Sequence, residues 1–148
     1  MSTQRKSATK TARPTTDYTL IFDGGSLGNP GQGYGSYVLV RNLDGKRRVQ
    51  RLRFEGMLTS NQAEYRTLIA GVEDLLSTIR GAGRSPGDFS LEVRGDSQLV
   101  IQQTRGQWKV RDLDLRDLKD RASDLLGELG KVRLIWQRRR LSERAVGH

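Results

Sequence analysis

The sequence predicts a single α/β domain in which helices pack on a mixed β-sheet. Three observations support this class. The chain has 148 residues, the usual size of one domain. Three strand patterns precede the first helix pattern, and helices and strands alternate afterwards. The expected order is β-β-β-α-β-α-α-β, followed by an arginine-rich segment for which we expect a further helix.

The first three strands are expected to be antiparallel. The run at residues 18–22, Tyr-Thr-Leu-Ile-Phe, is apolar on both faces, as in a central strand, and stops at Asp23-Gly24-Gly25. We interpret the glycine-rich stretch that continues to Gly35 as a long loop. The second and third strands are predicted at residues 36–41 and 47–55, with a hairpin signal at residues 42–45 between them.

An amphipathic helix is predicted at residues 62–80, because apolar residues recur with helical spacing before Gly81-Ala82-Gly83. These residues are Leu68, Ile69, Val72, Leu75, Leu76 and Ile79. A strand at 89–94 follows, then helices at 97–104 and 112–127 and a last strand at 132–136. The aspartates between 112 and 124 are expected to form the solvated face of their helix.

The charge indicates a polyanionic partner. The formal net charge is +9, from 26 Lys and Arg against 17 Asp and Glu, which favours nucleic acid. Four of these cations lie in residues 1–16, which lack acids and apolar runs and are expected to form a disordered basic arm. A transit peptide is the alternative, although the stretch is short and has no amphipathic stripe. Residues 17–148 are expected to form the globular domain.

Composition also excludes several classes of protein. No apolar stretch approaches the roughly 20 residues of a membrane-spanning helix, and the first 30 residues contain no secretory signal. We therefore expect no membrane partner and a cytoplasmic protein, and we expect a monomer. Cysteine is absent and histidine occurs once, which excludes thiolate nucleophiles and multi-histidine metal sites. Catalysis would therefore depend on carboxylates.

Three carboxylates are candidates for one metal site. Asp23 and Asp96 follow strands, where open α/β sheets bind ligands, and Glu64 lies on the apolar side of its helix. Each also has an ordinary explanation: Asp23 as a turn residue, Glu64 in a capping box with Asn61, and Asp96 as a helix cap. If the three converge, their repulsion requires a cation, and hard oxygen ligands select Mg²⁺ or Mn²⁺.

Three blocks of the sequence resemble the signature blocks of type 1 ribonuclease H. They occur in the family's order and with its spacings, and the similarity extends from about Tyr18 to the end. The resemblance implies the ribonuclease H-like fold, a mixed five-stranded sheet flanked by helices. The blocks are Asp23-Gly24-Gly25-Ser26 with Gly28-Asn29-Pro30-Gly31, Ser60-Asn61-Gln62-Ala63-Glu64-Tyr65, and Gly95-Asp96-Ser97-Gln98-Leu99-Val100.

The resemblance implies an endoribonuclease that cuts the RNA strand of RNA/DNA hybrids and leaves 5′-phosphate and 3′-hydroxyl ends. Asp23, Glu64 and Asp96 match the family's metal-binding carboxylates, and Asp23 is expected to bridge two Mg²⁺ or Mn²⁺ ions. Two such ions, roughly 3.5–4 Å apart, can activate the attacking water and stabilise the leaving oxygen.

The same blocks imply residues that bind the substrate. Asn29 and Asn61 match family positions that touch the minor groove of the hybrid, where amide groups can recognise 2′-hydroxyls. Thr59 matches a position that holds the DNA phosphate backbone. Gln62, in the second block, is included in the expected substrate-binding set.

The chain departs from the family at a fourth carboxylate in the final helix, where Val146 stands at the aspartate position. The family's spacing is otherwise kept at Trp136, Arg139, Ser142 and Ala145. We suspect that His148, the only histidine, replaces the aspartate, which gives a D-E-D-H catalytic and metal-binding set. Two residues along a helix rotate by about 200°, which argues against this ligand. Glu143, or no replacement at all, are the alternatives.

Two further groups are candidate substrate contacts. The basic, tryptophan-rich insertion of some family members is abbreviated here, leaving Trp108 beside Lys109 as a contact with DNA, or else as an aromatic helix cap. Arg138, Arg139 and Arg140 belong to residues 131–144, where six cations stand against one acid. Their approach to the expected site suggests phosphate contacts, with a solvated surface as the alternative.

Two other functions stay open. A noncatalytic or weakly active hybrid-binding module of the same fold is favoured by Val146 at the fourth carboxylate position. The second alternative function is a different two-metal nuclease of related fold, such as a proofreading exonuclease or a resolvase. Proofreading exonucleases resemble one another in an Asp-x-Glu on the first strand, and here Gly25 takes the place of that glutamate.

Overall fold

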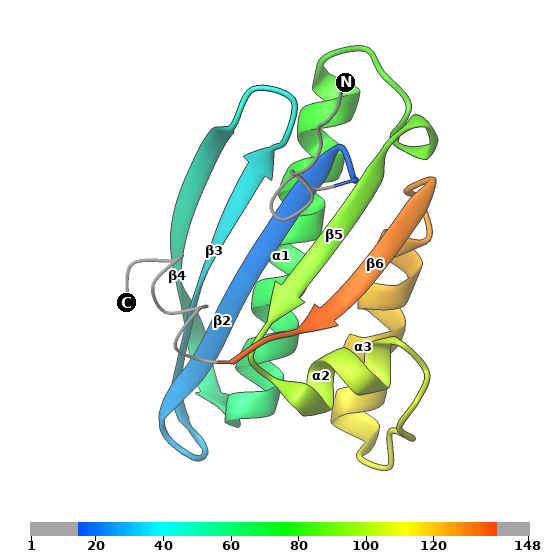
Figure 1. The fold of residues 1–148 in the computed structure, drawn as a ribbon. Coiled ribbons are helices and arrows are strands. Elements are labelled where there is room, and N and C mark those ends of the chain that lie inside the picture. Colours follow the sequence, from blue (N-terminus) through cyan, green and yellow to red (C-terminus); the bar gives the residue numbers. More distant parts are fainter. Residues whose placement is uncertain (1–14, 139–148) are drawn as a thin grey trace.

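The protein is a five-stranded sheet covered by helices, described by a computed structural model for residues 15–138 (Figure 1). The strand order is β4-β3-β2-β5-β6; β2, β3 and β4 are antiparallel neighbours, whereas β5 runs parallel to β2 and to β6. The expected fold class is therefore confirmed.

The strands are β2 (Tyr18–Gly28), β3 (Gly31–Arg41), β4 (Lys46–Leu58), β5 (Ser90–Gly95) and β6 (Lys131–Trp136). The helices are α1 (Ser60–Gly81), α2 (Gln98–Thr104) and α3 (Leu113–Leu126), with a short 3₁₀ helix η2 (Pro86–Asp88).

The stretch expected to be a long glycine-rich loop is instead the end of one strand and the start of the next. β2 continues to Gly28 and β3 begins at Gly31, so only Asn29 and Pro30 connect them. The prediction of a long loop was therefore wrong. Glycine inside a strand often marks a place where another segment approaches closely, and that is its meaning here.

Helix α1 crosses the β2–β3 hairpin too closely for side chains at two of these glycines. A Cβ atom on Gly24 would lie 2.8 Å from the carbonyl oxygen of Ala63. A Cβ atom on Gly35 would lie 1.9 Å from Oγ1 of Thr67, one turn further along the helix. The two glycines therefore set how closely the helix packs on the sheet.

Helix α1 begins earlier than expected. Thr59 is its N-cap: the Thr59 hydroxyl accepts a hydrogen bond from the Gln62 N–H at 3.1 Å, and the Gln62 side chain accepts one from the Thr59 N–H at 2.8 Å. The capping box of Asn61 and Glu64, offered as the ordinary explanation of Glu64, is not formed, because the helix already begins at Ser60 and its capping box joins Thr59 and Gln62. Glu64 is consequently not used as a cap.

The hydrophobic core lies between the sheet and the helices. The apolar stripe expected on α1 is confirmed, since Leu68, Val72 and Leu75 are fully buried. Leu91 and Val93 of β5 meet them from the sheet and are also fully buried. None of the helices within residues 15–138 is both long and apolar enough to cross a membrane.

The remaining boundaries lie close to the expected ones. Gly45 in the β3–β4 hairpin has a φ of 75°, a conformation that favours glycine, and Ser97 and Asp112 cap α2 and α3. The helix η2 was not expected. The basic arm lies almost entirely outside the described residues, although Thr16 is buried and its carbonyl accepts a hydrogen bond from Asn42. The expected last helix also lies outside them.

The close approach of α1 predicts that Gly35→Ala destabilises the protein. The added methyl group collides with Thr67, so the free energy of unfolding is expected to fall by about 1–3 kcal/mol, measured by urea denaturation. Thr67→Ala in the same chain should recover part of the loss. Gly81→Ala, where no atom lies within 4 Å of an added Cβ, is the control and should leave stability unchanged or slightly increased. Equal stabilities for Gly35→Ala and the control would contradict the packing described here.

Candidate active site

The candidate site lies where two parallel strands separate. The pairing of β2 with β5 ends at Phe22 and Gly95, and the next residues are Asp23 and Asp96. Beyond this point β2 continues in partnership with β3 alone. The two aspartates therefore flank a gap at the carboxyl end of β5. The chain continues from β2 toward one edge of the sheet and from β5 toward the other edge, and open α/β sheets bind ligands at such a point.

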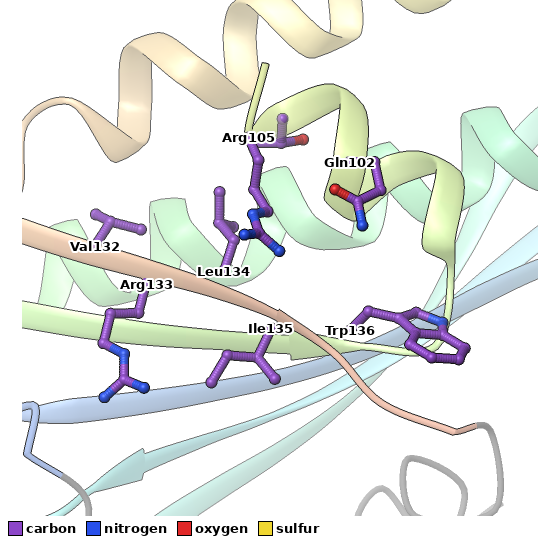
Figure 2. Close-up of a pocket in the computed structure, with 8 residues that line it drawn as sticks. Gln102, Arg105, Val132, Arg133, Leu134, Ile135 and Trp136 are labelled. Atoms are coloured by element: carbon purple, nitrogen blue, oxygen red, sulfur yellow. The ribbon is translucent and has the colours of Figure 1, made fainter. Parts of the chain in front are cut away.

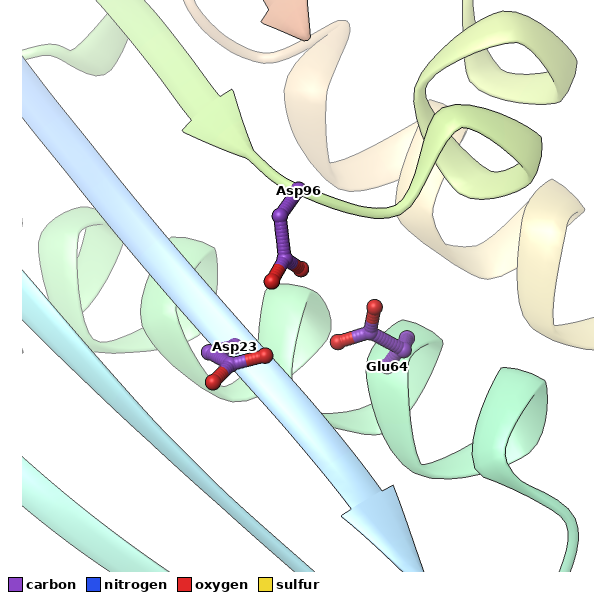
Figure 3. A group of neighbouring side chains, drawn as sticks. All are labelled: Asp23, Glu64 and Asp96. Atoms are coloured by element: carbon purple, nitrogen blue, oxygen red, sulfur yellow. The ribbon is translucent and has the colours of Figure 1, made fainter. Parts of the chain in front are cut away.

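Helix α1 brings a third carboxylate into this gap. The Gly24 N–H donates a hydrogen bond to Oε1 of Glu64, so the glutamate is held directly against β2. Figure 3 shows the side chains of Asp23, Glu64 and Asp96 pointing toward one another from β2, α1 and the end of β5. One carboxylate oxygen from each lies within 4.8 Å of those of the others. The convergence expected from the sequence is thus present.

These three carboxylates form a strongly negative and poorly hydrated centre. Asp23 and Glu64 are each only 4% exposed, and Asp96 is half-buried. Like charges this close disfavour simultaneous ionisation unless a cation compensates them. The donor set consists of carboxylate oxygens alone, and the chain has no cysteine. Such a set fits a hard divalent cation such as Mg²⁺ or Mn²⁺ and does not favour zinc.

The end of β6 fixes the position of Asp96. The indole N–H of Trp136 donates a hydrogen bond of 3.1 Å to the Asp96 carbonyl oxygen, and the Gln137 N–H donates one of 2.9 Å to the Gly95 carbonyl. The sequence places Trp136 at the end of the last strand and in the family's spacing, but this contact was not predicted. The signal available was its position at the end of the last strand, level with Gly95.

A buried tyrosine joins the neighbouring helices beneath the site. Tyr65, next to Glu64 on α1, donates a hydrogen bond of 2.7 Å to the Gln103 side chain on α2. Burial raises the pKa of Tyr65 to about 12, so the hydroxyl remains protonated near neutral pH. The helix that follows Asp96 is thereby attached to the helix that carries Glu64.

The structure brings together the substrate-binding residues expected near the hairpin and α1. Oδ1 of Asn29, in the β2–β3 turn, accepts a hydrogen bond of 3.1 Å from the Ser60 N–H, which places the turn beside the start of α1. Asn61 is the second residue of that helix and is half-buried. The side chains of Thr59 and Gln62 are engaged in the helix cap.

The other candidates lie elsewhere or outside the described residues. Trp108 is in the connection between α2 and α3 and is 45% exposed. Arg138 is exposed just after β6. Arg139, Arg140 and His148, with the competing Glu143 and Val146, lie outside residues 15–138, so their expected roles stay predictions.

A groove adjoins the site on its β6 side. It has a volume of about 760 Å³ and runs between α2 and β6 (Figure 2). Arg105 and the half-exposed Trp136 are among its lining residues. The Arg133 side chain points to the other side of β6, where it donates a hydrogen bond to Thr15 (Figure 2). A cation and an exposed aromatic ring along one groove are typical of surfaces that contact nucleic acid.

Comparison with known proteins identifies relatives over most of the chain. A family model described as "Reverse transcriptase-like" matches residues 21–146. The curated Ribonuclease HI of Halobacterium salinarum is 43% identical over 105 residues, which are 71% of this chain and 48% of that protein. The chain therefore spans about half the length of this relative.

Solved structures agree with this relationship. RNase H1 from the same archaeon superposes with a TM-score of 0.72 at 37% identity, over 86% of this chain and 89% of that one. The N-terminal RNase H domain of a Mycobacterium tuberculosis protein gives 0.72 at 31% identity, over 84% and 89%. LC11-RNase H1, solved in complex with an RNA/DNA hybrid, gives 0.75 at 27% identity, over 86% and 89%.

The sheet order, the helix layer and the carboxylate cluster together define a ribonuclease H-like domain. With the family match over residues 21–146 and these structural neighbours, the chain belongs to the type 1 ribonuclease H family. The family resemblance carried by the three sequence blocks is therefore confirmed.

The crowded carboxylates predict that divalent cations stabilise the fold. Thermal unfolding of the wild-type protein should shift to higher temperature when Mn²⁺ replaces EDTA. Asp23→Asn removes one of the repelling charges, so in EDTA it is expected to be more stable than the wild type by about 1–2 kcal/mol and to lose most of the Mn²⁺ shift. Asp124→Asn, on the exposed face of α3, is the control and should keep the shift. A full Mn²⁺ shift in Asp23→Asn would argue against a metal site at the carboxylates.

Proposed function

We propose that this chain is an endoribonuclease that hydrolyses the RNA strand of RNA/DNA hybrids and leaves 5′-phosphate and 3′-hydroxyl ends. The observation that carries the proposal is the meeting of Asp23, Glu64 and Asp96 within 4.8 Å in a member of the type 1 ribonuclease H family. A structural neighbour solved with an RNA/DNA hybrid supports the substrate. The proposal retains the monomeric state and the cytoplasmic location expected from the sequence; light scattering after size-exclusion chromatography tests the former.

The three carboxylates would hold two Mg²⁺ or Mn²⁺ ions, and the family resemblance gives Asp23 a role toward both. Divalent ions held there would supply an activated water as the nucleophile and neutralise charge on the leaving 3′ oxygen. The chain's own contribution is to hold the ligands in place before substrate arrives. Gly24 fixes the Glu64 carboxylate and Trp136 fixes the backbone of Asp96, which reduces the rearrangement needed during reaction.

The start of α1 and the β2–β3 turn are the proposed site of substrate recognition. Asn29 and Asn61 would present amide groups to the minor groove, where 2′-hydroxyls distinguish RNA from DNA. Their proximity through the Asn29–Ser60 hydrogen bond supports a joint role. Thr59 and Gln62 would act through the helix terminus that they cap, and Trp108 and Arg138–Arg140 would contact the backbone.

Asp96→Asn tests the catalytic proposal. It removes one negative ligand with little change of shape, so cleavage of a labelled RNA/DNA hybrid should fall by at least about 10³-fold while hybrid binding is largely retained. The wild type should cut only the RNA strand of the hybrid and leave matched RNA and DNA duplexes intact, in Mg²⁺ or in Mn²⁺. Tight hybrid binding by the wild type without cleavage would instead indicate a noncatalytic binding module.

The proposed role of His148 is tested by two substitutions. His148→Ala should lower the cleavage rate sharply if the imidazole takes part, and Val146→Asp should raise it if the position merely lacks its fourth carboxylate. Rates should be measured under saturating Mn²⁺ to separate weak metal binding from slow chemistry. An unchanged rate for His148→Ala would eliminate the histidine as a ligand, and a decrease in Glu143→Gln would favour the glutamate.

A further inference from the structure

Strand β4 carries the densest run of positive charge among the described residues. Within residues 46–53, five of eight side chains are cationic, and the first acid is Glu55. Residues 46–51 and Arg53 are all exposed. The cations, called the β4 basic strand below, are Lys46, Arg47, Arg48, Arg51 and Arg53.

Most of this charge is not neutralised within the described part of the molecule. Arg48 forms an ion pair with Asp74 of α1, which also accepts a hydrogen bond of 2.6 Å from the Tyr37 hydroxyl. Lys46, Arg47 and Arg53 form no ion pair with any residue between 15 and 138. Lys46 and Arg47 at the start of the strand and Arg53 six residues further along are therefore exposed to solvent, where they attract anions.

The β4 basic strand lies beside the carboxylate centre. Arg51 pairs across β3 with Ser36, and Ser36 pairs with Asp23, so the three residues form one row across the sheet. Two strand spacings separate Arg51 from Asp23, which is roughly 10 Å. Arg47 lies four residues further along the strand, or about 14 Å. A duplex positioned at Asp23 is long enough to reach this edge of the sheet.

A small pocket opens at the far end of the strand, with a volume of about 150 Å³. Its lining combines cations from β3 and β4 with the polar side chains of Tyr18 and Thr78. Arg41 forms an ion pair with Asp44, and its hydrogen bond lowers the pKa of that carboxyl to about 2. Lys46 and Arg47 form no such pair within residues 15–138. Cationic and hydroxyl groups of this kind make most of the contacts to phosphates in nucleic-acid complexes.

Helix α3 offers a polyanion much less positive charge than β4 does. It mixes four acids with three cations, so its formal charge is −1. The acids are Asp114, Asp117, Asp120 and Asp124, and the cations are Arg116, Lys119 and Arg121. A polyanion is therefore attracted more strongly to the cations of residues 46–53 than to α3.

We propose that the β4 basic strand binds the phosphate backbone of a nucleic-acid duplex alongside the carboxylate centre, without recognising its sequence. The position of the duplex rests on the proposed function, but backbone binding itself requires no cleavage. Cations on an edge strand also prevent pairing with other sheets, and that role alone predicts no effect on duplex binding.

The test compares two charge-matched triple variants. Lys46, Arg47 and Arg53 are changed to Gln in one, and Arg80, Arg84 and Lys131, which are exposed and belong to neither the carboxylate centre nor the surface around Trp108, in the other. Binding to a fluorescent 20-base-pair DNA duplex, which is not cleaved, is measured by anisotropy between 50 and 200 mM salt. Loss of three phosphate contacts should reduce the slope of log K against log salt by about 2–3 for the β4 variant, and should weaken binding at least about tenfold at low salt. Equal slopes for the two variants would overturn the proposal.

A second measurement avoids substitutions, in case the altered edge strand aggregates. Acetylation of Lys46 in the wild-type protein should slow at least severalfold when the duplex is bound, whereas the exposed Lys131 at the start of β6 should react at an unchanged rate. Equal protection of both lysines, or of neither, would also overturn the proposal. Cleavage of the RNA/DNA hybrid by the wild type tests the proposed function separately, so failure of one proposal is distinguishable from failure of the other.

Discussion

The close contact between α1 and the β2–β3 hairpin is the constraint on which the site depends. Gly24 has no side chain, so the Ala63 backbone packs directly on β2. At that separation the Gly24 N–H reaches the Glu64 carboxylate, and the glutamate is held next to Asp23. A larger residue at Gly24 would push the helix away from the sheet and separate two of the three carboxylates. The same glycines that permit tight packing therefore also determine the geometry of the centre.

The separation of β2 from β5 determines where Asp23 and Asp96 lie. Because their pairing ends at Phe22 and Gly95, Asp23 and Asp96 face a gap that no strand fills. The fold then holds three like charges together, an arrangement that costs stability without a cation. Contacts on two sides offset this cost: Trp136 holds the Asp96 backbone, and Tyr65 joins α1 to α2. The carboxylate cluster thus lowers the stability of the fold, and the contacts of Trp136 and Tyr65 next to it raise that stability again.

Local patterns in the sequence predicted most of the fold and the central carboxylates. Hydrophobic periodicity located α1 and β5, and the positions of Asp23 and Asp96 after strands indicated a shared site. The glycine-rich stretch was misinterpreted as a loop because the helix that requires the glycines lies some 40 residues away in the chain. Asn61 was offered as a possible cap where Thr59 is the actual one, because both are good capping residues and only the backbone decides between them. The role of Trp136 and the position of the β4 cations beside Asp23 depend on strand register, which local patterns do not specify.

The central claim is that Asp23, Glu64 and Asp96 form a divalent-cation centre, and crystallography with Mn²⁺ tests it most directly. Anomalous scattering from crystals of the wild-type protein grown with Mn²⁺ should show density among these three carboxylates, and Asp96→Asn crystals should show it weakened. Mn²⁺ density elsewhere, with the three carboxylates paired instead to arginine side chains, would contradict the claim.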